Sequence, residues 1–294
     1  MPMAFTTPDE RLAAPSKNNI AIFGPSGVGK TYLARSLPPA TTLFLDAESG
    51  MKAVGDWRGD SADLRGMAAS LRLHPWELCR AFASLLAGPD FSDYELHPAG
   101  RVPGPYSPEM HDQYVSVLGD PAELFAKYAT VFVDSITVAS RWSFAWSNAQ
   151  PESISDKGKK DTRGTYGLHG REMIRWLTQL QHSKKSIVIV GILDRGEDDM
   201  KRLTWTPQIE GGKAGRELPG IFDNVMTLAR FKQTEEGLIF DPVEGSIRGL
   251  VTGLLNPWGL PAKDRSGALE LVEPPDLGAI LAKIQSASAN PSAI

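Results

Sequence analysis

The chain has 294 residues, which is enough for one large α/β domain with insertions but not for two full domains. Hydrophobic residues make up 41% and charged residues 22%, which excludes a largely disordered or fibrous protein. The formal net charge of −4 excludes a surface that is basic all over, so any contact with nucleic acid must be local.

Signals for disulfides, export and membrane insertion are absent from this sequence. The one cysteine, Cys79, cannot form an intramolecular disulfide, and its apolar neighbours indicate a buried packing thiol. The first residues lack a basic segment followed by an apolar one, and no apolar stretch is long enough to cross a bilayer. We therefore expect a protein of the reducing cytoplasm without a membrane partner.

Short β-branched runs alternate with helical patterns, which predicts an α/β fold with a mainly parallel central sheet flanked by helices. The expected strands of this sheet are residues 19–23, 41–45, 130–133, 186–192 and 225–229. Two later runs, 238–241 and 248–252, lie close together along the chain and predict a small antiparallel C-terminal extension. Residues 276–284 have the apolar spacing of a short closing helix.

Three segments stand apart from this alternation. Residues 1–17 and 286–294 lack periodicity, and we expect flexible tails on either side of one domain of residues 18–285. Residues 50–129 are too many for a simple βα crossover and carry helical patterns such as 75–87, which predicts an inserted helical subdomain. The packing face expected for that helix consists of Trp76, Leu78, Phe82 and Leu85.

The first expected strand leads directly into a glycine-rich loop and then into a helix-forming stretch. The loop and the first residue after it read Gly24, Pro25, Ser26, Gly27, Val28, Gly29, Lys30, Thr31 and Tyr32. This is a complete G-x-x-x-x-G-K-[ST] P-loop, whose backbone N–H groups cradle phosphates. Lys30 is expected to neutralise the β- and γ-phosphates, and the Thr31 hydroxyl to ligate Mg²⁺. The sequence therefore predicts a site for Mg-ATP.

Two other strands are expected to deliver carboxylates to the same edge of the sheet. The run 130–133 ends in Asp134, and a carboxylate in that place can hold Mg²⁺ as the Walker B acid. The run 41–45, which we expect beside the P-loop strand, leads into Asp46 and Glu48. Either of these two acids could orient the attacking water.

The order of these pieces resembles the phage and prophage ATP-binding proteins of the RecA-like, AAA-type group of P-loop ATPases, which includes single-strand annealing and recombination ATPases. The matching pieces are residues 24–31, 45–48, 133–136, 166–167 with the helix after them, and 220–223. The resemblance implies a RecA-like fold, Mg-dependent ATP hydrolysis and a homo-oligomeric ring or filament. It also implies that Glu48 is the general base and Asp46 a local support.

Residues 262–267 are similar to the K-x-R-x-G element of hexameric RecA-like helicases. By that resemblance Lys263 and Arg265 reach the γ-phosphate of a neighbouring subunit, although a solvated turn of alternating charges is the alternative.

One strand departs from the RecA-like pattern. Such motors usually carry a glutamine at the end of the strand that here reads Ile192-Leu193. The coupling role of that glutamine is therefore open, unless Gln208 or Arg195 takes it.

In RecA-like folds, the loops after the Walker B segment and after the next strand face a polymer. The corresponding segments here, 153–165 and 195–218, combine cations with glycine, and the second adds an aromatic ring. A solvated loop is the alternative for each segment alone, whereas together they favour contact with single-stranded DNA. The residues expected to bind it are Lys157, Lys159, Lys160, Arg163, Lys201, Arg202 and Trp205.

These expectations make an ATPase that acts on single-stranded DNA in phage-type recombination, annealing or replication the leading hypothesis. Its location would be the host cytoplasm, and a single-strand-binding protein is a further candidate partner. The alternatives are a nucleotide-controlled assembly factor with protein partners and a P-loop small-molecule kinase with an acceptor pocket in the insertion. Glu48 favours water over an alcohol as the acceptor and so argues against the kinase.

Overall fold

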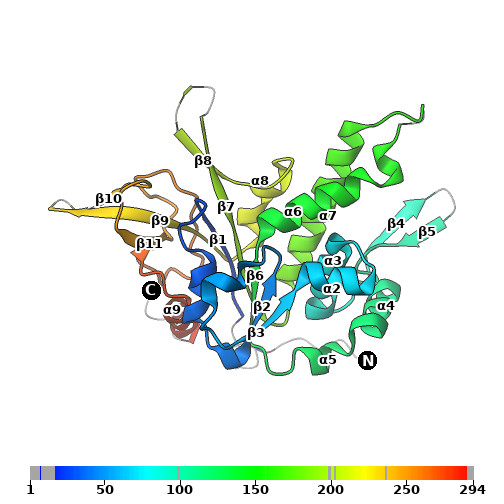
Figure 1. Ribbon diagram of the computed structural model, residues 1–294, viewed down its shortest axis with the longest axis horizontal. Helices are drawn as coiled ribbons and strands as arrows, with labels where there is room; N and C mark the ends of the chain where they lie inside the picture. Colours follow the sequence, from blue (N-terminus) through cyan, green and yellow to red (C-terminus); the bar gives the residue numbers. More distant parts are fainter. Residues whose placement is uncertain are drawn as a thin grey trace.

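The computed structural model describes residues 7, 17–97, 100–155, 157–197, 200–201, 203–235 and 237–289. In this part of the chain a ten-stranded sheet runs in the order β12-β11-β9-β1-β7-β6-β2-β3, with β10 paired to β9 and β8 paired to β7 (Figure 1). The strands with parallel partners are β1 (Asn19–Gly24), β2 (Thr42–Asp46), β3 (Asp60–Asp63), β6 (Thr130–Asp134), β7 (Ser186–Glu197) and β9 (Asn224–Thr234). The other strands of this sheet are β8 (Leu203–Pro207), β10 (Gly237–Phe240), β11 (Ile247–Val251) and β12 (Val272–Glu273).

The predicted α/β fold with a mainly parallel sheet is confirmed, and so is the antiparallel extension, which is formed by β10, β11 and β12 beside β9. The prediction that the run 41–45 lies beside the P-loop strand is wrong. Strand β1 lies between β7 and β9, and both β7 and β6 separate it from β2. In the sheet, β2 lies three positions from β1. The later strands β6 and β7 lie between them, and their apolar residues are buried on both faces.

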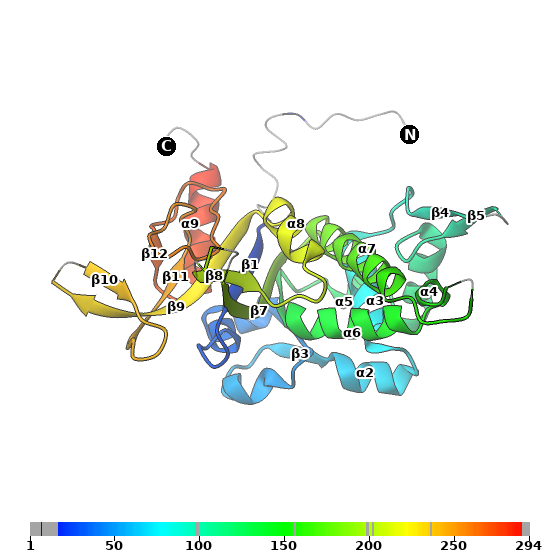
Figure 2. The same ribbon diagram turned by 90° about the horizontal axis from the view of Figure 1, so that it is seen from above.

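Alternate residues of the central strands face two different helical layers, as the period of two in a strand requires. Ala21 and Phe23 of β1 belong to the core cluster under α3 (Pro75–Ala87), α6 (Ile136–Asn148) and α7 (Thr162–Gln181). Ile20 and Ile22 belong to the cluster under α9 (Leu277–Ala289) and the short 3₁₀ helices η1 (Thr31–Ser36) and η3 (Gly50–Val54). Figure 2 shows α3, α6 and α7 grouped together, and α9 beside β11 and β12 at the other end.

The segment 50–129 is more than a helical subdomain. Its start supplies β3, which pairs in parallel with β2 at the edge of the sheet, because the chain runs extended there before Asp63 caps the next helix. It also contains an antiparallel hairpin, β4 (Tyr94–His97) with β5 (Gly100–Pro103). Its helices, besides α3, are α2 (Leu64–Leu71), α4 (Pro108–Leu118) and α5 (Pro121–Leu124).

The expected packing face of the inserted helix is confirmed, because Trp76, Leu78, Phe82 and Leu85 are all buried. Trp76 meets Trp176 of α7 edge to face at 5.5 Å, and its Nε1 donates to Glu172 at 2.8 Å. Arg80 forms a buried ion pair with the same glutamate at 3.2 Å. The insertion is therefore fixed to α7 by both apolar and polar contacts.

The remaining helices are α8 (Lys213–Ile221) and the 3₁₀ turns η2 (Pro39–Thr41) and η4 (Pro151–Ser153). Helix α9 continues to Ala289, so residues 286–289 of the expected C-terminal tail are helical. None of the helices in the described residues combines the length and apolar character needed to span a bilayer.

Candidate active site

The P-loop joins the carboxyl end of β1 to η1, as its sequence predicts. Gly27 and Gly29 have φ angles of +75° and +103°, which side chains rarely allow. Gly24 has no room for a Cβ, because that atom would lie 2.6 Å from the carbonyl oxygen of Leu228 on β9. The glycines are thus required by the backbone of the loop and by its close contact with the neighbouring strand.

The ammonium group of Lys30 closes the loop on itself. Its Nζ donates to the carbonyl oxygens of Gly24 at 2.9 Å and Pro25 at 3.0 Å. Burial lowers the pKa of Lys30, whereas the negative charges of Asp134 and Glu48 raise it. The lysine therefore lies between the phosphate loop and two acids, in reach of any anion that displaces the two carbonyls.

Thr31 and Asp134 meet across the sheet edge. Thr31 Oγ1 donates to Asp134 Oδ2 at 2.6 Å, and Asp134 is 2% exposed. Burial is the main cause that raises the pKa of Asp134 to about 6; Glu48 and Asp46 raise it further, and the Thr31 hydrogen bond and Lys30 oppose the rise. A site with this excess of negative charge around one hydroxyl fits a hard divalent cation.

Gly50, which the sequence analysis did not single out, packs closely against both residues. A Cβ on Gly50 would lie 3.0 Å from Asp134 Oδ2 and 3.3 Å from Thr31 Cγ2. A side chain at position 50 would therefore press against the two expected Mg²⁺ ligands.

Asp46 and Glu48 differ in what they contact. The buried carboxylate of Asp46 accepts backbone N–H groups of Glu48 at 3.1 Å, Gly50 at 2.9 Å and Met51 at 3.3 Å. Glu48 is exposed and accepts a hydrogen bond from the hydroxyl of Ser135, the residue after Asp134. The Asp46 carboxylate is therefore engaged with the backbone of its own loop, whereas the Glu48 carboxylate lies exposed beside the Walker B strand.

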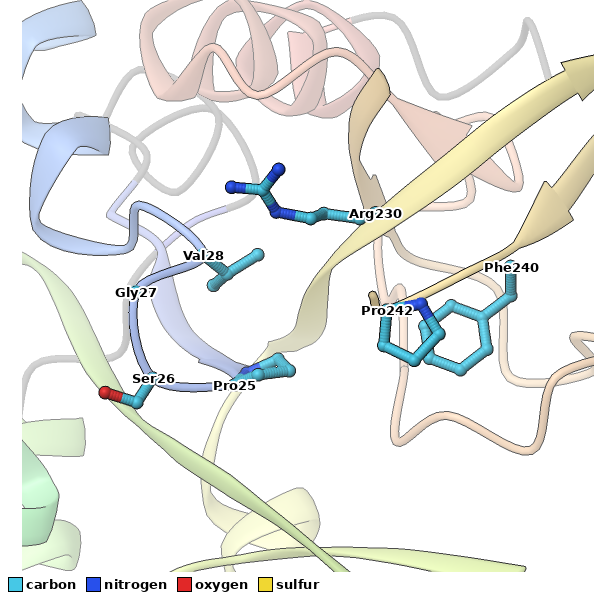
Figure 3. Close-up of a pocket in the computed structure, with 7 residues that line it drawn as sticks. All are labelled: Pro25, Ser26, Gly27, Val28, Arg230, Phe240 and Pro242. Atoms are coloured by element: carbon cyan, nitrogen blue, oxygen red, sulfur yellow. The ribbon is translucent and has the colours of Figure 1, made fainter. Parts of the chain in front are cut away.

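A cavity of about 110 Å³ lies between the P-loop and the strands of the antiparallel extension (Figure 3). Its lining residues are Pro25, Ser26, Gly27, Val28, Arg230, Phe240 and Pro242. Tyr32, which follows the P-loop, is 42% exposed, and the guanidinium groups of Arg35 and Arg248 lie 4.6 Å and 5.3 Å from the centre of its ring. Motif reasoning missed Arg230 and Arg248, because they come from strands far along the chain.

Lys263 and Arg265 lie at the opposite edge of the sheet from the P-loop, beside the start of β9. Lys263 Nζ donates to the carbonyl oxygens of Pro219 at 2.6 Å and Phe222 at 2.8 Å, so it binds the end of α8 in its own chain. Arg265 pairs with Asp223 at 3.1 Å but is 70% exposed on its side chain. A role in a neighbour's site stays a prediction for both residues.

Of the two candidates for the missing glutamine, Gln208 lies beside the end of the sheet strand. Its backbone N–H donates to the Ile192 oxygen at 2.8 Å, and its side-chain oxygen accepts from Arg141 at 3.1 Å. Ile192 is the register partner of Gly24. Arg195 lies farther along the β7–β8 hairpin, where it pairs with Trp205.

The two expected DNA loops both project towards the top of Figure 1, between α6 and α7 and at the β7–β8 hairpin. Lys157, Lys159, Arg163 and Lys201 are exposed, and Lys160 donates to the backbone oxygen of Asn148. The ring of Trp205 is half-buried and packs against Phe240 with centroids 5.6 Å apart, so it has a packing contact within its own chain. Arg202 lies outside the described residues.

Comparison with known families agrees with this geometry. The family described as AAA domain matches residues 16–266, whereas no curated protein matches the chain. The match covers more than half of the chain and contains the P-loop, Glu48 and Asp134. The chain therefore belongs to the AAA domain family, which implies that it binds nucleotide and, as the family does in general, hydrolyses it.

Proposed function

We propose that the protein hydrolyses ATP with Mg²⁺ at this site and uses the cycle on single-stranded DNA, as a homo-oligomer in phage-type recombination, annealing or replication. The observation that carries the hydrolysis is the meeting of four groups at one sheet edge: Lys30 and Thr31 of the P-loop, Asp134 and Glu48. Phosphate-binding, cation-binding and basic groups are thus available together.

In the proposed reaction, Lys30 leaves the carbonyl oxygens of Gly24 and Pro25 and binds the β- and γ-phosphate oxygens. Glu48, held by the Ser135 hydroxyl, takes a proton from water as the water oxygen bonds to the γ-phosphorus. The bond from that phosphorus to the bridging oxygen breaks, and ADP leaves with its electrons. Asp46 serves only to hold the loop that carries Glu48.

Thr31 Oγ1 and Asp134 are the groups that would hold Mg²⁺, because a hydroxyl and a carboxylate are oxygen ligands of the kind this ion prefers. When bound, Mg²⁺ neutralises charge on the β- and γ-phosphates. Asp134 must then be ionised, and a divalent charge beside it favours the carboxylate over the acid form.

Support for single-stranded DNA comes from exposed cations on two segments that both extend towards the top of Figure 1. Lys157 and Lys159 lie in the α6–α7 loop and are exposed without a carboxylate partner in the described part of the chain. Lys201 lies at the β7–β8 hairpin, whose strand β7 also reaches the P-loop through the pairing of Ile192 with Gly24. A strand shared by the two places offers a physical link between nucleotide and polymer.

ATP turnover measured with and without single-stranded DNA tests this function. We expect Mg-dependent release of phosphate that rises when single-stranded DNA is added and rises less with duplex DNA. Phosphate release that single-stranded DNA leaves unchanged would contradict the DNA role and favour a protein partner. Transfer of phosphate to a nucleoside or metabolite instead of water would contradict the ATPase and favour the kinase.

A further inference from the structure

Two arginines face each other across the strand pair that borders the P-loop. Arg248 of β11 is the register partner of Arg230 of β9, so both side chains project from the same side of the strand pair. Arg230 lines the cavity against the P-loop (Figure 3). Arg248 Nη1 lies 2.5 Å from the place that a Cβ on Gly29 would occupy. Both cations therefore belong to the surroundings of the phosphate loop.

Neither arginine has a carboxylate partner at ion-pair distance in the described residues. Arg230 donates to the Gly245 oxygen at 3.4 Å, and Arg248 contacts the ring of Tyr32. Two positions from Arg230 on the same strand, Lys232 is paired with Asp241 at 2.8 Å and Glu244 at 2.5 Å. Like charges opposite one another on neighbouring strands are destabilising. An anion bound beside the two arginines would relieve this repulsion, and the described residues place no carboxylate there.

The order of strands tells which part of a nucleotide the pair would meet. In the sequence β11-β9-β1-β7-β6, the P-loop strand separates the arginines from Asp134. The groups expected to handle the γ-phosphate and Mg²⁺ lie on the β6 side, whereas Arg248 approaches Gly29 and Tyr32 from the β11 side. Backbone N–H groups of this part of a P-loop cradle the α- and β-phosphates.

We propose that Arg248, with Arg230 beside it, is a nucleotide-binding residue that contacts the α- and β-phosphates from within the same chain. This inference rests on the proposed nucleotide site and adds to it a specific cation that no P-loop motif contains. Its planar guanidinium can donate to two phosphate oxygens at once. Because ATP and ADP share the two phosphates, Arg248 binds substrate and product alike, unlike a group that acts on the γ-phosphate.

The test compares Arg248→Gln and Arg248→Lys with Lys232→Gln, a matched control in which a cation on the same strand pair is removed but is already paired. Affinities for ATP and ADP are measured by calorimetry, and thermal midpoints without nucleotide by circular dichroism. We expect Arg248→Gln to weaken both nucleotides by about tenfold to a hundredfold, the range of a charge-assisted contact. Its midpoint should stay equal or rise, because a repulsion is removed. Arg248→Lys should lose several-fold in affinity, and Lys232→Gln should leave both affinities unchanged.

Unchanged ADP affinity in Arg248→Gln would overturn the inference, and so would a loss confined to ATP, which would place the arginine on the γ-phosphate. If Arg248→Gln does not fold, the ADP affinity of Arg248→Lys is the deciding measurement. An affinity equal to that of the wild type in this variant overturns the inference. Wild-type protein that binds neither ATP nor ADP would instead refute the nucleotide site itself. The two failures are therefore distinguishable in the same experiment.

Discussion

Thr31 Oγ1 and Asp134 Oδ2 lie 2.6 Å apart although the two residues are 103 positions apart along the chain. Strand β6 ends at Asp134 directly opposite Asp46 of β2, and the P-loop returns to the same edge of the sheet. The fold of the chain thus brings the hydroxyl and the carboxylate together. Lys30 lies between this pair and the phosphate loop. The residues of this site can be tested one at a time by substitution.

Lys30→Ala should severely weaken the binding of ATP and abolish its hydrolysis. The variant removes the cation that would leave the carbonyls of Gly24 and Pro25 for the phosphates. We expect a loss of affinity on the order of 10²-fold, with turnover at background, because charged contacts in a half-buried site are strong. Near-normal turnover in protein with an unchanged thermal midpoint would contradict the assignment of the P-loop.

Glu48→Gln and Asp46→Asn should separate chemistry from support. The glutamine keeps the shape of Glu48 and its contact with Ser135 but cannot take a proton, so turnover should fall by about 10²- to 10⁴-fold while ATP stays bound. Asp46→Asn weakens the acceptor of three backbone N–H groups and should lower the free energy of unfolding by about 1–3 kcal/mol. Turnover and urea unfolding, measured for both variants, distinguish the role of Glu48 in chemistry from the role of Asp46 in stabilising the loop. Normal hydrolysis by Glu48→Gln would shift the base to another group.

The raised pKa of Asp134 predicts how stability depends on pH. Its pKa is about 6 in the folded chain against an ordinary value of 3.8, so the folded state holds the proton more tightly than the unfolded state. The resulting stabilisation is complete below the unfolded pKa and is lost as pH rises through about 6, up to about 3 kcal/mol in all. Nucleotide-free wild-type protein should therefore lose more stability between pH 5 and pH 7 than Asp134→Asn does. Parallel pH profiles in urea unfolding would argue against a buried, protonated carboxyl.

Local patterns predicted most of the strands, because each consists of a short apolar run between turn residues. The positions of the P-loop and Asp134 at the ends of strands, and of Glu48 two residues after the end of β2, were predictable for a similar reason, whereas their roles stay predictions. The order of the strands in the sheet was not predictable from the sequence, because the place of β2 beside β6 depends on how the later strands pack. Residues near the ends of neighbouring strands in sequence need not be neighbours in the sheet.

Roles that depend on contacts between distant segments stayed hidden for the same reason. Arg248 reaches Gly29 only because β11 pairs with β9, and β9 lies beside the P-loop strand. Lys263, whose role in a neighbouring subunit stays a prediction from the resemblance to the K-x-R-x-G element, also binds the end of α8 in its own chain. Such contacts leave no spacing signal in the sequence, because spacing reports only on a residue's own element.

Replacing Lys157, Lys159 and Lys160 with Ala should weaken binding of single-stranded DNA while basal ATP turnover survives. Each lost phosphate contact lowers the log–log slope of affinity against salt by about 0.7, so three contacts would lower it by about 2. Lys160 is already engaged with the Asn148 oxygen, and the first two lysines should account for most of the change. Fluorescence anisotropy at several salt concentrations measures the slope. Lys184→Ala, an exposed lysine beyond the opposite end of α7, is the control, and an equal effect there would make the α6–α7 loop an ordinary solvated loop.

Arg265 and Lys263 should respond differently to substitution if the site is shared between subunits. Arg265 is exposed at the edge of the sheet opposite its own P-loop, so it could reach phosphate only in a neighbour. Arg265→Ala should preserve ATP affinity and cut turnover by about 10³-fold, the low end of what an arginine finger contributes. Lys263→Ala should first lower the thermal midpoint, because it frees the carbonyls of Pro219 and Phe222.

Mixing Arg265→Ala with Lys30→Ala subunits separates a shared site from misfolding. The two variants spoil opposite halves of a composite site, so interfaces that pair an intact P-loop with an intact Arg265 should recover a fraction of the turnover. The recovered activity should rise with protein concentration, since it requires assembly. If mixing recovers nothing and wild-type turnover per subunit is independent of concentration, Arg265 is part of a surface turn. The pair with Asp223 would then be its whole role, and hydrolysis would be complete within one chain.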